Sequence, residues 1–233
     1  MIVILLACIT IVIYSTYSLF GIYQKYEVSA KTYRVIEDIY NDAQADSSRT
    51  EEMKGINNDY VGWITIKDTK VNYPVVKTKN NSFYLSHNFY KEEDFVGTIF
   101  MDSENVIDSL DKNIILYGHN MKDHSMFGSL KKYLDQDYFQ KHKTVQLDIL
   151  DKTYEWEIFA AYTSHEIDWM QTKFDDENDF ENYLSDIHKK SNVSEQIAID
   201  NEDNILTLST CTVNSNETER FIVHAKLIRI KGE

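Results

Sequence analysis

Eight short apolar runs, separated by polar turns, follow one another along the chain after Gly55. The runs are rich in Val, Ile, Phe and Tyr, residue types that suit the pleated, half-buried surface of a sheet. They cover residues 61–66, 71–76, 97–101, 113–117, 144–150, 154–162, 205–211 and 220–230. Short strands at this spacing are typical of a barrel or a sandwich. The sequence therefore predicts a mostly β domain over residues 55–233.

Three segments between these runs have a helical pattern instead. Residues 125–134 and 136–142 lie between the fourth and fifth runs, and residues 177–190 lie between the sixth and seventh. The last of these helices begins among Asp175, Asp176, Glu177 and Asp179, as the helix dipole favours. This acidic cluster lacks the alternating Asp spacing and the Gly of a calcium loop. We interpret it as a solvated helix start.

The first 23 residues carry no charged side chain and are nearly all apolar or small. A helix needs about 20 such residues to cross a bilayer. We expect a transmembrane anchor over residues 1–23 and a helical stalk over residues 24–54, ahead of the β domain. A cleaved signal peptide is the alternative, although the apolar stretch is long for one.

Charge and cysteine content narrow the classes of function. The formal net charge is −14, and every charged residue follows position 23. Such an acidic surface repels nucleic acid. The chain has two cysteines, Cys8 in the apolar segment and Cys211 near the C-terminus. They cannot plausibly pair, and neither Cys pairs nor a His-x-x-x-His motif indicates a metal site. The β domain thus has a lone thiol, which by count alone is more often inert than reactive.

The surroundings of Cys211 favour reactivity. The run 205–211 ends at the thiol, a polar turn over residues 212–219 follows, and Arg220 opens the next run. Pairing of the two runs as an antiparallel hairpin would put Cys211 and Arg220 at the same end of the ladder. A nearby cation favours the thiolate. The guanidinium cannot act as a base near neutral pH, but it can donate hydrogen bonds to a developing oxyanion. An Arg at a strand start, seen alone, is more often an ordinary surface residue.

A general base has to come from elsewhere, and the chain has seven histidines. His119 follows the run 113–117 and stands beside Gly118, where a strand end can face a cleft. His124 is its nearest rival, and His224 lies inside the last run. The pattern ranks His119 first.

Several blocks resemble one family. The block Thr207-Leu208-Ser209-Thr210-Cys211, followed by Arg220, resembles the signature of sortases. The blocks Asn-Tyr-Pro-Val-Val at 72–76, Gly-Thr-Ile-Phe-Met-Asp at 97–102 and Tyr-Gly-His-Asn-Met at 117–121 resemble class B sortases in particular. The resemblance implies an eight-stranded barrel with an N-terminal helix and a helix inserted between strands six and seven. It also implies that His119, Cys211 and Arg220 are the catalytic residues.

The same resemblance implies a substrate groove and a set of partners. The groove would be bordered by Asn72, Val76, Ser209 and Thr210, with Trp169 and Met170 as the other wall. The implied partners are secreted proteins with a C-terminal sorting motif and a cell-wall precursor amine, and no cofactor is needed. One departure is the acidic stretch 102–105, where class B sortases carry a basic residue, which leaves the substrate subclass open.

The resemblance also implies a single-pass membrane protein with its catalytic domain outside the cell. The charge pattern conflicts with this orientation. Lys25, Lys31 and Arg34 follow the apolar segment and no basic residue precedes it, so the positive-inside rule by itself favours a cytoplasmic domain.

Two other functions remain open at the level of the sequence. A cysteine peptidase could use the same three residues and release its acyl group to water. The order of His119 before Cys211 disfavours a papain-like fold but not hydrolysis. A non-catalytic barrel that binds a surface partner, with an inert Cys211, is the second alternative.

Overall fold

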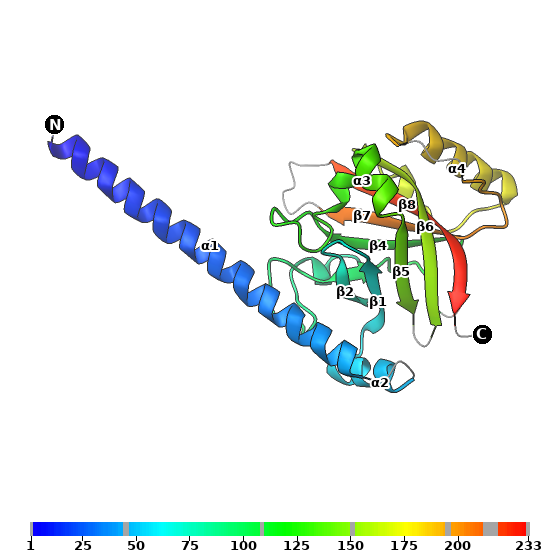
Figure 1. Cartoon of the computed structure of the whole chain (residues 1–233), viewed down its shortest axis with the longest axis horizontal. Helices are drawn as coiled ribbons and strands as arrows, with labels where there is room; N and C mark the ends of the chain where they lie inside the picture. The colour runs from blue at the N-terminus through cyan, green and yellow to red at the C-terminus, as the bar shows by residue number, and fades with distance from the viewer. Residues whose placement is uncertain are drawn as a thin grey trace.

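The computed structural model describes residues 2–43, 47–107, 110–149, 152–193, 197–211 and 219–231. In these ranges eight strands close into a barrel in the order β1-β2-β3-β4-β7-β8-β6-β5 (Figure 1). The strands are β1 (Tyr60–Ile66), β2 (Asn72–Val76), β3 (Ile99–Met101), β4 (Asn113–His119), β5 (Thr144–Ile149), β6 (Lys152–Ser164), β7 (Ile205–Cys211) and β8 (Arg220–Lys231). Every predicted run forms a strand, and the barrel is confirmed over the sandwich.

The pairing of β4 with β7 joins two segments that are far apart in the sequence. The two strands run parallel and stay in register from Asn113↔Ile205 to His119↔Cys211. Parallel neighbours need a long crossover connection, which here contains β5, β6 and helix α4 (Glu177–Lys190). The helix expected between strands six and seven is confirmed. Asp176 caps it by accepting a hydrogen bond from the Asp179 amide at 2.9 Å, which explains the acidic start.

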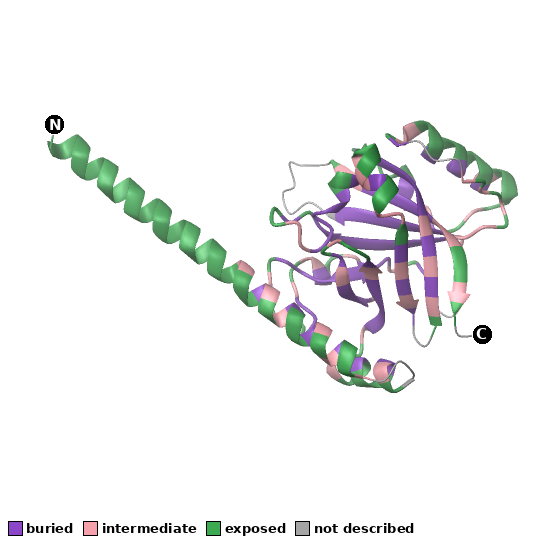
Figure 2. Cartoon of the chain, in the orientation of Figure 1, coloured by how far each residue is buried: buried purple, intermediate pink, exposed green. Residues whose placement is uncertain are grey.

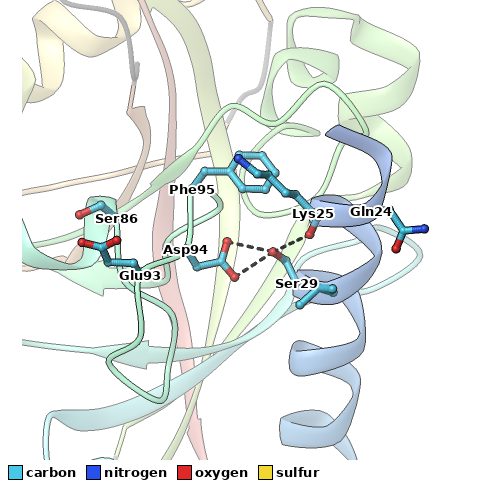
Figure 3. Close-up of a pocket in the computed structure, with 8 residues that line it drawn as sticks. Gln24, Lys25, Ser29, Ser86, Glu93, Asp94 and Phe95 are labelled. Carbon is cyan, nitrogen blue, oxygen red and sulfur yellow. Dashed lines mark hydrogen bonds between the residues drawn. The ribbon is translucent and has the colours of Figure 1, made fainter. Parts of the chain in front are cut away.

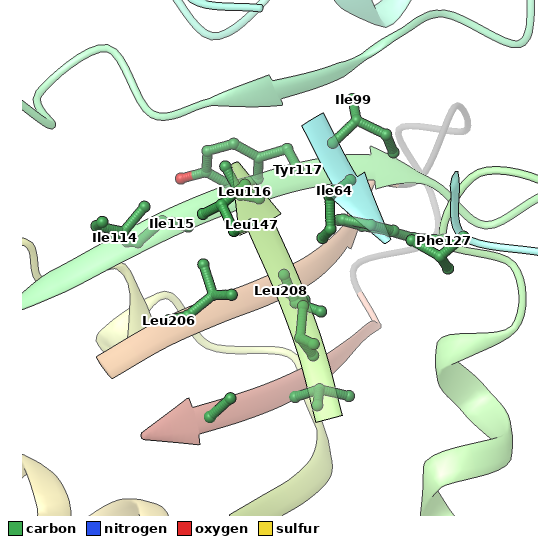
Figure 4. Close-up of a cluster of buried hydrophobic side chains, with 14 of the residues drawn as sticks. Ile64, Ile99, Ile114, Ile115, Leu116, Tyr117, Phe127, Leu147, Leu206 and Leu208 are labelled. Carbon is green, nitrogen blue, oxygen red and sulfur yellow. The ribbon is translucent and has the colours of Figure 1, made fainter. Parts of the chain in front are cut away.

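The core fills the inside of the barrel. Leu116 of β4 and Leu208 of β7 are fully buried, and Figure 4 shows them together with Leu147 of β5. Burial of each such side chain stabilises the fold by roughly 1.5–3 kcal/mol. Neighbouring residues of a strand point to opposite faces. The residues directly before and after each of these leucines therefore face outward. The functional residues therefore have to come from the outer face or from the ends of the strands.

Helix α1 (Ile2–Asp42) has two parts with different surroundings. Its first half is exposed (Figure 2), and among the described residues α1 is the one helix long and apolar enough to cross a membrane. Its second half lies along the barrel and buries Ser29, Tyr33, Ile36 and Tyr40, at the spacing of one helix face. Tyr40 stacks on Trp63 of β1, with ring centroids 4.0 Å apart. A short helix, α2 (Ser47–Ile56), precedes β1.

The helix predicted over residues 125–134 is wrong in its first half. Helical structure begins only at the 3-10 helix η2 (Leu130–Leu134), which is followed by α3 (Gln136–Lys141) as expected. His124 and Met126 have φ angles of 67° and 49°, and this left-handed conformation is incompatible with an α-helix. Met126 instead bridges back to Asn120. Turn geometry, which hydropathy does not report, overrides the helical pattern here.

His224 of β8 is fully buried beneath α4. Burial, and after it the nearby cations His188 and Lys190, lower the pKa of its imidazole from 6.5 to about 3. In the unfolded chain the imidazole regains an ordinary pKa of about 6.5. At a pH between these two pKa values, the imidazole binds a proton in the unfolded state but not in the folded state. This contribution to stability is complete above about pH 6.5 and is lost as the pH falls toward 3.

We therefore predict that the free energy of unfolding falls on acidification by up to about 1.4 kcal/mol per pH unit because of this one group. Denaturant unfolding of the wild type and of His224→Gln between pH 7 and pH 4 measures the effect, since all other carboxylates and histidines are shared. Equal slopes in the wild type and in His224→Gln would contradict the prediction.

Candidate active site

Three neighbouring strands bring His119, Cys211 and Arg220 to one end of the barrel. β4 and β7 end together, with His119 paired to Cys211. β7 and β8 pair antiparallel up to Ser209↔Ile222, and the same register puts position 220 opposite position 211. The predicted hairpin is confirmed, while the pairing with β4 adds His119 from a segment far away in the sequence.

The register also decides which face of the sheet carries these positions. Residues 113, 115, 117 and 119 of β4 share one face, and position 211 of β7 lies on it next to His119. At the other end of that face Asn113 donates a hydrogen bond to Tyr183 of α4 at 3.0 Å. The face is therefore the outer one, partly covered by α4 and by the segment that precedes it.

A backbone carbonyl holds the ring of His119. The side chain is 4% exposed, and its Nε2 lies 2.6 Å from the Leu85 carbonyl oxygen. A carbonyl oxygen can only accept, so Nε2 carries a hydrogen and donates it. In the neutral ring the lone pair is then on Nδ1. Nδ1 is the atom through which this histidine can take up or release a proton.

Gly97 makes room for this arrangement. Its φ angle is +63°, and a Cβ there would come within 2.5 Å of the Tyr84 carbonyl oxygen and 3.2 Å of Cδ2 of His119. Only glycine adopts this backbone without strain. Gly97 opens the block 97–102 that resembles class B sortases, and a lone Gly just before a strand is the sequence signal for such a position. No sequence signal marks the Leu85 carbonyl.

Helix α1 supports the loop that contains Leu85 and Gly97. The Tyr33 hydroxyl donates to the Gly97 carbonyl. The Ser29 hydroxyl lies 2.8 and 2.9 Å from the two carboxylate oxygens of Asp94 (Figure 3). A cavity of about 510 Å³ opens beside this contact, between α1 and residues 86–95. The surroundings of His119 thus include a helix that begins in the apolar N-terminal segment.

Arg220 is tied to the strand that carries the cysteine. Its Nη1 donates to the Thr210 carbonyl at 3.1 Å, and the Phe221 amide donates to Thr210 Oγ1 at 2.9 Å. Thr210 itself is 1% exposed, so the structure uses it to join β7 and β8. The guanidinium is only half-buried, and its position beside residue 211 suits a donor to negative charge.

Two of the predicted groove residues lie in one row across the outer face. Val76 pairs with Phe100, Phe100 with Tyr117, and Tyr117 with Ser209. Trp169, in the 3-10 helix η3 (Asp168–Met170), lies over this row with its ring 6.1 Å from that of Tyr117. The structure therefore brings Trp169 next to this row, and its role as a groove wall stays a prediction.

Asn72 has different neighbours. Its side-chain oxygen accepts hydrogen bonds from Trp63 Nε1 at 2.6 Å and Thr65 Oγ1 at 3.0 Å, and its amide donates to Glu37 of α1 at 2.7 Å. The structure joins Asn72 to α1 and β1 rather than to the row of Val76 and Ser209.

In the part of the chain that the structure describes, acidic and histidine side chains do not gather into a metal centre. Across the described ranges, no group of three or more His, Cys, Asp or Glu residues could hold a metal ion. His124, the rival of His119, lies in the left-handed turn after β4, with Nδ1 3.4 Å from the Gly128 carbonyl oxygen.

Comparison with known proteins gives one consistent result. Residues 64–228 match the family model of the sortase domain. The chain is 41% identical to sortase B of Listeria monocytogenes over 179 residues, which cover 76% of this chain and 73% of the relative. Its fold is similar to that of a Staphylococcus aureus sortase B–substrate complex, with a TM-score of 0.83, 32% identity, and coverage of 88% of this chain and 99% of the other. Sortase B of B. anthracis gives a TM-score of 0.84 with 36% identity, over 89% of this chain and 99% of the other.

Proposed function

The chain belongs to the sortase family of cysteine transpeptidases, and we propose that it cleaves a C-terminal sorting motif of secreted proteins through a Cys211 thioester and transfers the acyl group to a cell-wall amine. The observation that carries the proposal is the pairing of β4 with β7 and of β7 with β8, which gathers His119, Cys211 and Arg220 at one strand end. A structure of the Staphylococcus aureus relative is a substrate complex, which supports the binding of a substrate by this chain.

In the proposed mechanism Nδ1 of His119 takes the proton of the Cys211 thiol, the resulting thiolate attacks the scissile carbonyl carbon, and the carbonyl oxygen becomes an oxyanion. Arg220 donates hydrogen bonds to that oxyanion. The tetrahedral intermediate collapses, the C–N bond breaks, and His119 gives the leaving amine its proton. An incoming amine then attacks the thioester, His119 takes up the proton of that amine, and the thiolate leaves. Nδ1 of His119 serves each of these proton transfers, because Nε2 is bonded to the Leu85 carbonyl.

The N-terminal half of α1 supports a location at the membrane. This half is apolar and exposed. We propose that residues 1–23 anchor the protein as a single span and that the catalytic domain of residues 55–233 lies outside the cell, where secreted substrates and wall precursors are found. Residues 24–54 would connect the two, with the second half of α1 lying against the barrel. Family membership supports this orientation, whereas the basic residues Lys25, Lys31 and Arg34 after the apolar segment favour the opposite one.

Product analysis tests the proposal. The protein is incubated with a small library of Pro-containing sorting peptides, with and without an amine acceptor, and the products are measured by mass. A ligated product that requires both the acceptor and Cys211 is the expected result. Cleavage without ligation would mean a cysteine peptidase. A complete lack of Cys211-dependent product would favour a binding module.

The role of Arg220 gives a separate prediction. Arg220→Lys keeps the positive charge but loses the planar fork of donors. We expect kcat to fall by about 10²–10³-fold, the usual cost of losing an oxyanion donor, with a much smaller change in KM. Steady-state kinetics on the best peptide measures both. Arg229→Lys, at an exposed site on the same strand, is the control and should behave as the wild type. A kcat within about threefold of wild type for Arg220→Lys would exclude the oxyanion role.

A further inference from the structure

The outer face that carries the three proposed catalytic residues also carries buried polar side chains farther along the same strands. Each of the three strands contributes one: Asn113 of β4, Thr207 of β7 and His224 of β8, and each is 0% exposed. Thr207 pairs with His224 across the hairpin. Buried polar groups are costly unless they are hydrogen-bonded, and helix α4 covers these three. The hydrogen bonds that these three side chains form are therefore an integral part of the fold.

Three hydrogen bonds join Asn113 to Thr207, Thr207 to His224, and His224 to Tyr162. Their hydrogens can be placed in only one consistent way. The Thr207 hydroxyl donates to Asn113 Oδ1 at 2.7 Å, which uses its single hydrogen. His224 Nδ1 lies 2.9 Å from Thr207 Oγ1 and must therefore be the donor of that bond. In the neutral ring Nε2 then accepts, and it does so from the Tyr162 hydroxyl at 3.0 Å. The lowered pKa of His224 keeps the imidazole in this neutral form near pH 7.

The chain of bonds continues to the backbone of the groove wall. The Asn113 amide donates one hydrogen to the Gln171 carbonyl at 2.8 Å and one to the Tyr183 hydroxyl at 3.0 Å. Tyr183 of α4 then donates its own hydrogen to the Trp169 carbonyl at 2.8 Å. A directed series of hydrogen bonds thus links β6, β8, β7 and β4 to α4 and to residues 169–171.

The end point of this chain matters because of where Trp169 lies. Its indole packs against Tyr117, two residues before His119, on the outer face of the sheet. The indole nitrogen is bonded to the Glu166 carbonyl at 2.7 Å, within its own loop. The Trp169 carbonyl is therefore a buried point at which the wall segment is hydrogen-bonded to α4. Closer to the surface, the Gln171 side-chain amide donates to Asp179 of α4 at 2.7 Å and Lys190 of α4 donates to Asp168. Asn113 binds the same segment at the Gln171 carbonyl.

We propose that Tyr183, held by the Asn113–Thr207–His224 chain, is a positioning residue that fixes the Trp169–Gln171 wall relative to the strands carrying His119, Cys211 and Arg220, and so determines how tightly the sorting peptide is held. The inference rests on the proposed function for its substrate. In this proposal the buried residues of the hydrogen-bond chain do not contact the peptide, but they control the width of the groove.

The first test is Tyr183→Phe, which removes the hydroxyl and leaves the ring. The Trp169 carbonyl loses its donor and one hydrogen of the Asn113 amide loses its acceptor, so the wall segment loosens. We expect KM for the peptide to rise about fivefold, the change that corresponds to one buried hydrogen bond, and kcat to stay within about twofold. Tyr133→Phe is the matched control: Tyr133 is also buried, and its hydroxyl donates to a carbonyl, that of His142, at 2.8 Å, but outside this chain. The control should leave KM unchanged.

A second variant tests the chain at its centre. Thr207→Val is nearly isosteric and removes the link between His224 and Asn113. It should reproduce the rise in KM, and the double variant Thr207→Val with Tyr183→Phe should raise KM by less than the product of the single effects, because both act on one unit. Effects that multiply fully would show that the residues act independently and would overturn the proposal.

Hydrogen exchange gives a readout that needs no activity. In the full-length protein, both Tyr183→Phe and Thr207→Val should speed amide exchange in residues 165–172, whereas Tyr133→Phe should not. Unchanged exchange there, or an equal change in KM with Tyr133→Phe, overturns the proposal. If the wild type forms no acyl product from any peptide, the proposed function fails. The exchange data then still decide whether the hydrogen-bond chain fixes the Trp169–Gln171 wall.

Discussion

An alanine at position 211 is expected to abolish acyl transfer and to leave the barrel folded. The proposed thiolate is the group that forms the acyl-enzyme. We expect a loss of at least about 10⁴-fold in kcat/KM, since members of a catalytic unit fail together. Mass analysis of peptide plus amine acceptor measures the loss, and thermal unfolding checks the fold.

The second cysteine provides a matched control for this experiment. Cys8 lies in the exposed apolar half of α1, and Cys8→Ala should keep full activity. Adding His119→Ala to the Cys211→Ala variant should cost nothing further, because the two side chains act on the same steps. Product from Cys211→Ala at the wild-type rate would mean that another group is the nucleophile.

Gly97→Ala is expected to slow the enzyme strongly although residue 97 does no chemistry. The new Cβ would meet a backbone oxygen at 2.5 Å and the edge of the His119 ring at 3.2 Å, in a backbone conformation that alanine disfavours. The strain should lower the free energy of unfolding by about 1–3 kcal/mol. Relief of the strain moves His119 away from Leu85. Because small misplacements are costly, we expect kcat to fall by about 100-fold.

Denaturant unfolding and steady-state kinetics measure the two effects separately. Gly55→Ala is the control, since Gly55 lies in α2 with open space where its Cβ would be. That change should stabilise the protein by about 0.5–1 kcal/mol and leave kcat unchanged. If Gly97→Ala kept the kcat of the wild type, the loop of Leu85 and Gly97 would have no part in positioning His119.

Much of the architecture was predictable because its signals are local. The eight apolar runs form the eight strands of the described barrel, since β-branched and aromatic residues between polar turns suit the pleated, half-buried surface of a sheet. Helix α4 was predictable from its acidic start, where Asp176 is the cap. The β7–β8 hairpin follows from two runs joined by a short polar turn.

The segment 125–134 shows where local signals fail. Its composition favours a helix, but left-handed residues at His124 and Met126 turn the chain back toward Asn120. Side-chain hydropathy carries no information about such φ angles. The order of the strands was equally hidden, because β4 and β7 pair across a long crossover and parallel pairing leaves no mark in either strand alone.

For this protein the sequence by itself determined the strands, the inserted helix, the hairpin that brings positions 211 and 220 to the same end and, through family resemblance, the histidine to consider. Only the tertiary structure decided that His119 lies in register with Cys211, that the Leu85 carbonyl fixes its ring, and that Gly97 makes room for it. The physical reason is the same in each case. Side-chain type and spacing encode local conformation, whereas a backbone carbonyl, a φ angle or a chain of buried hydrogen bonds such as that from Tyr162 to Trp169 exists only once distant segments have packed.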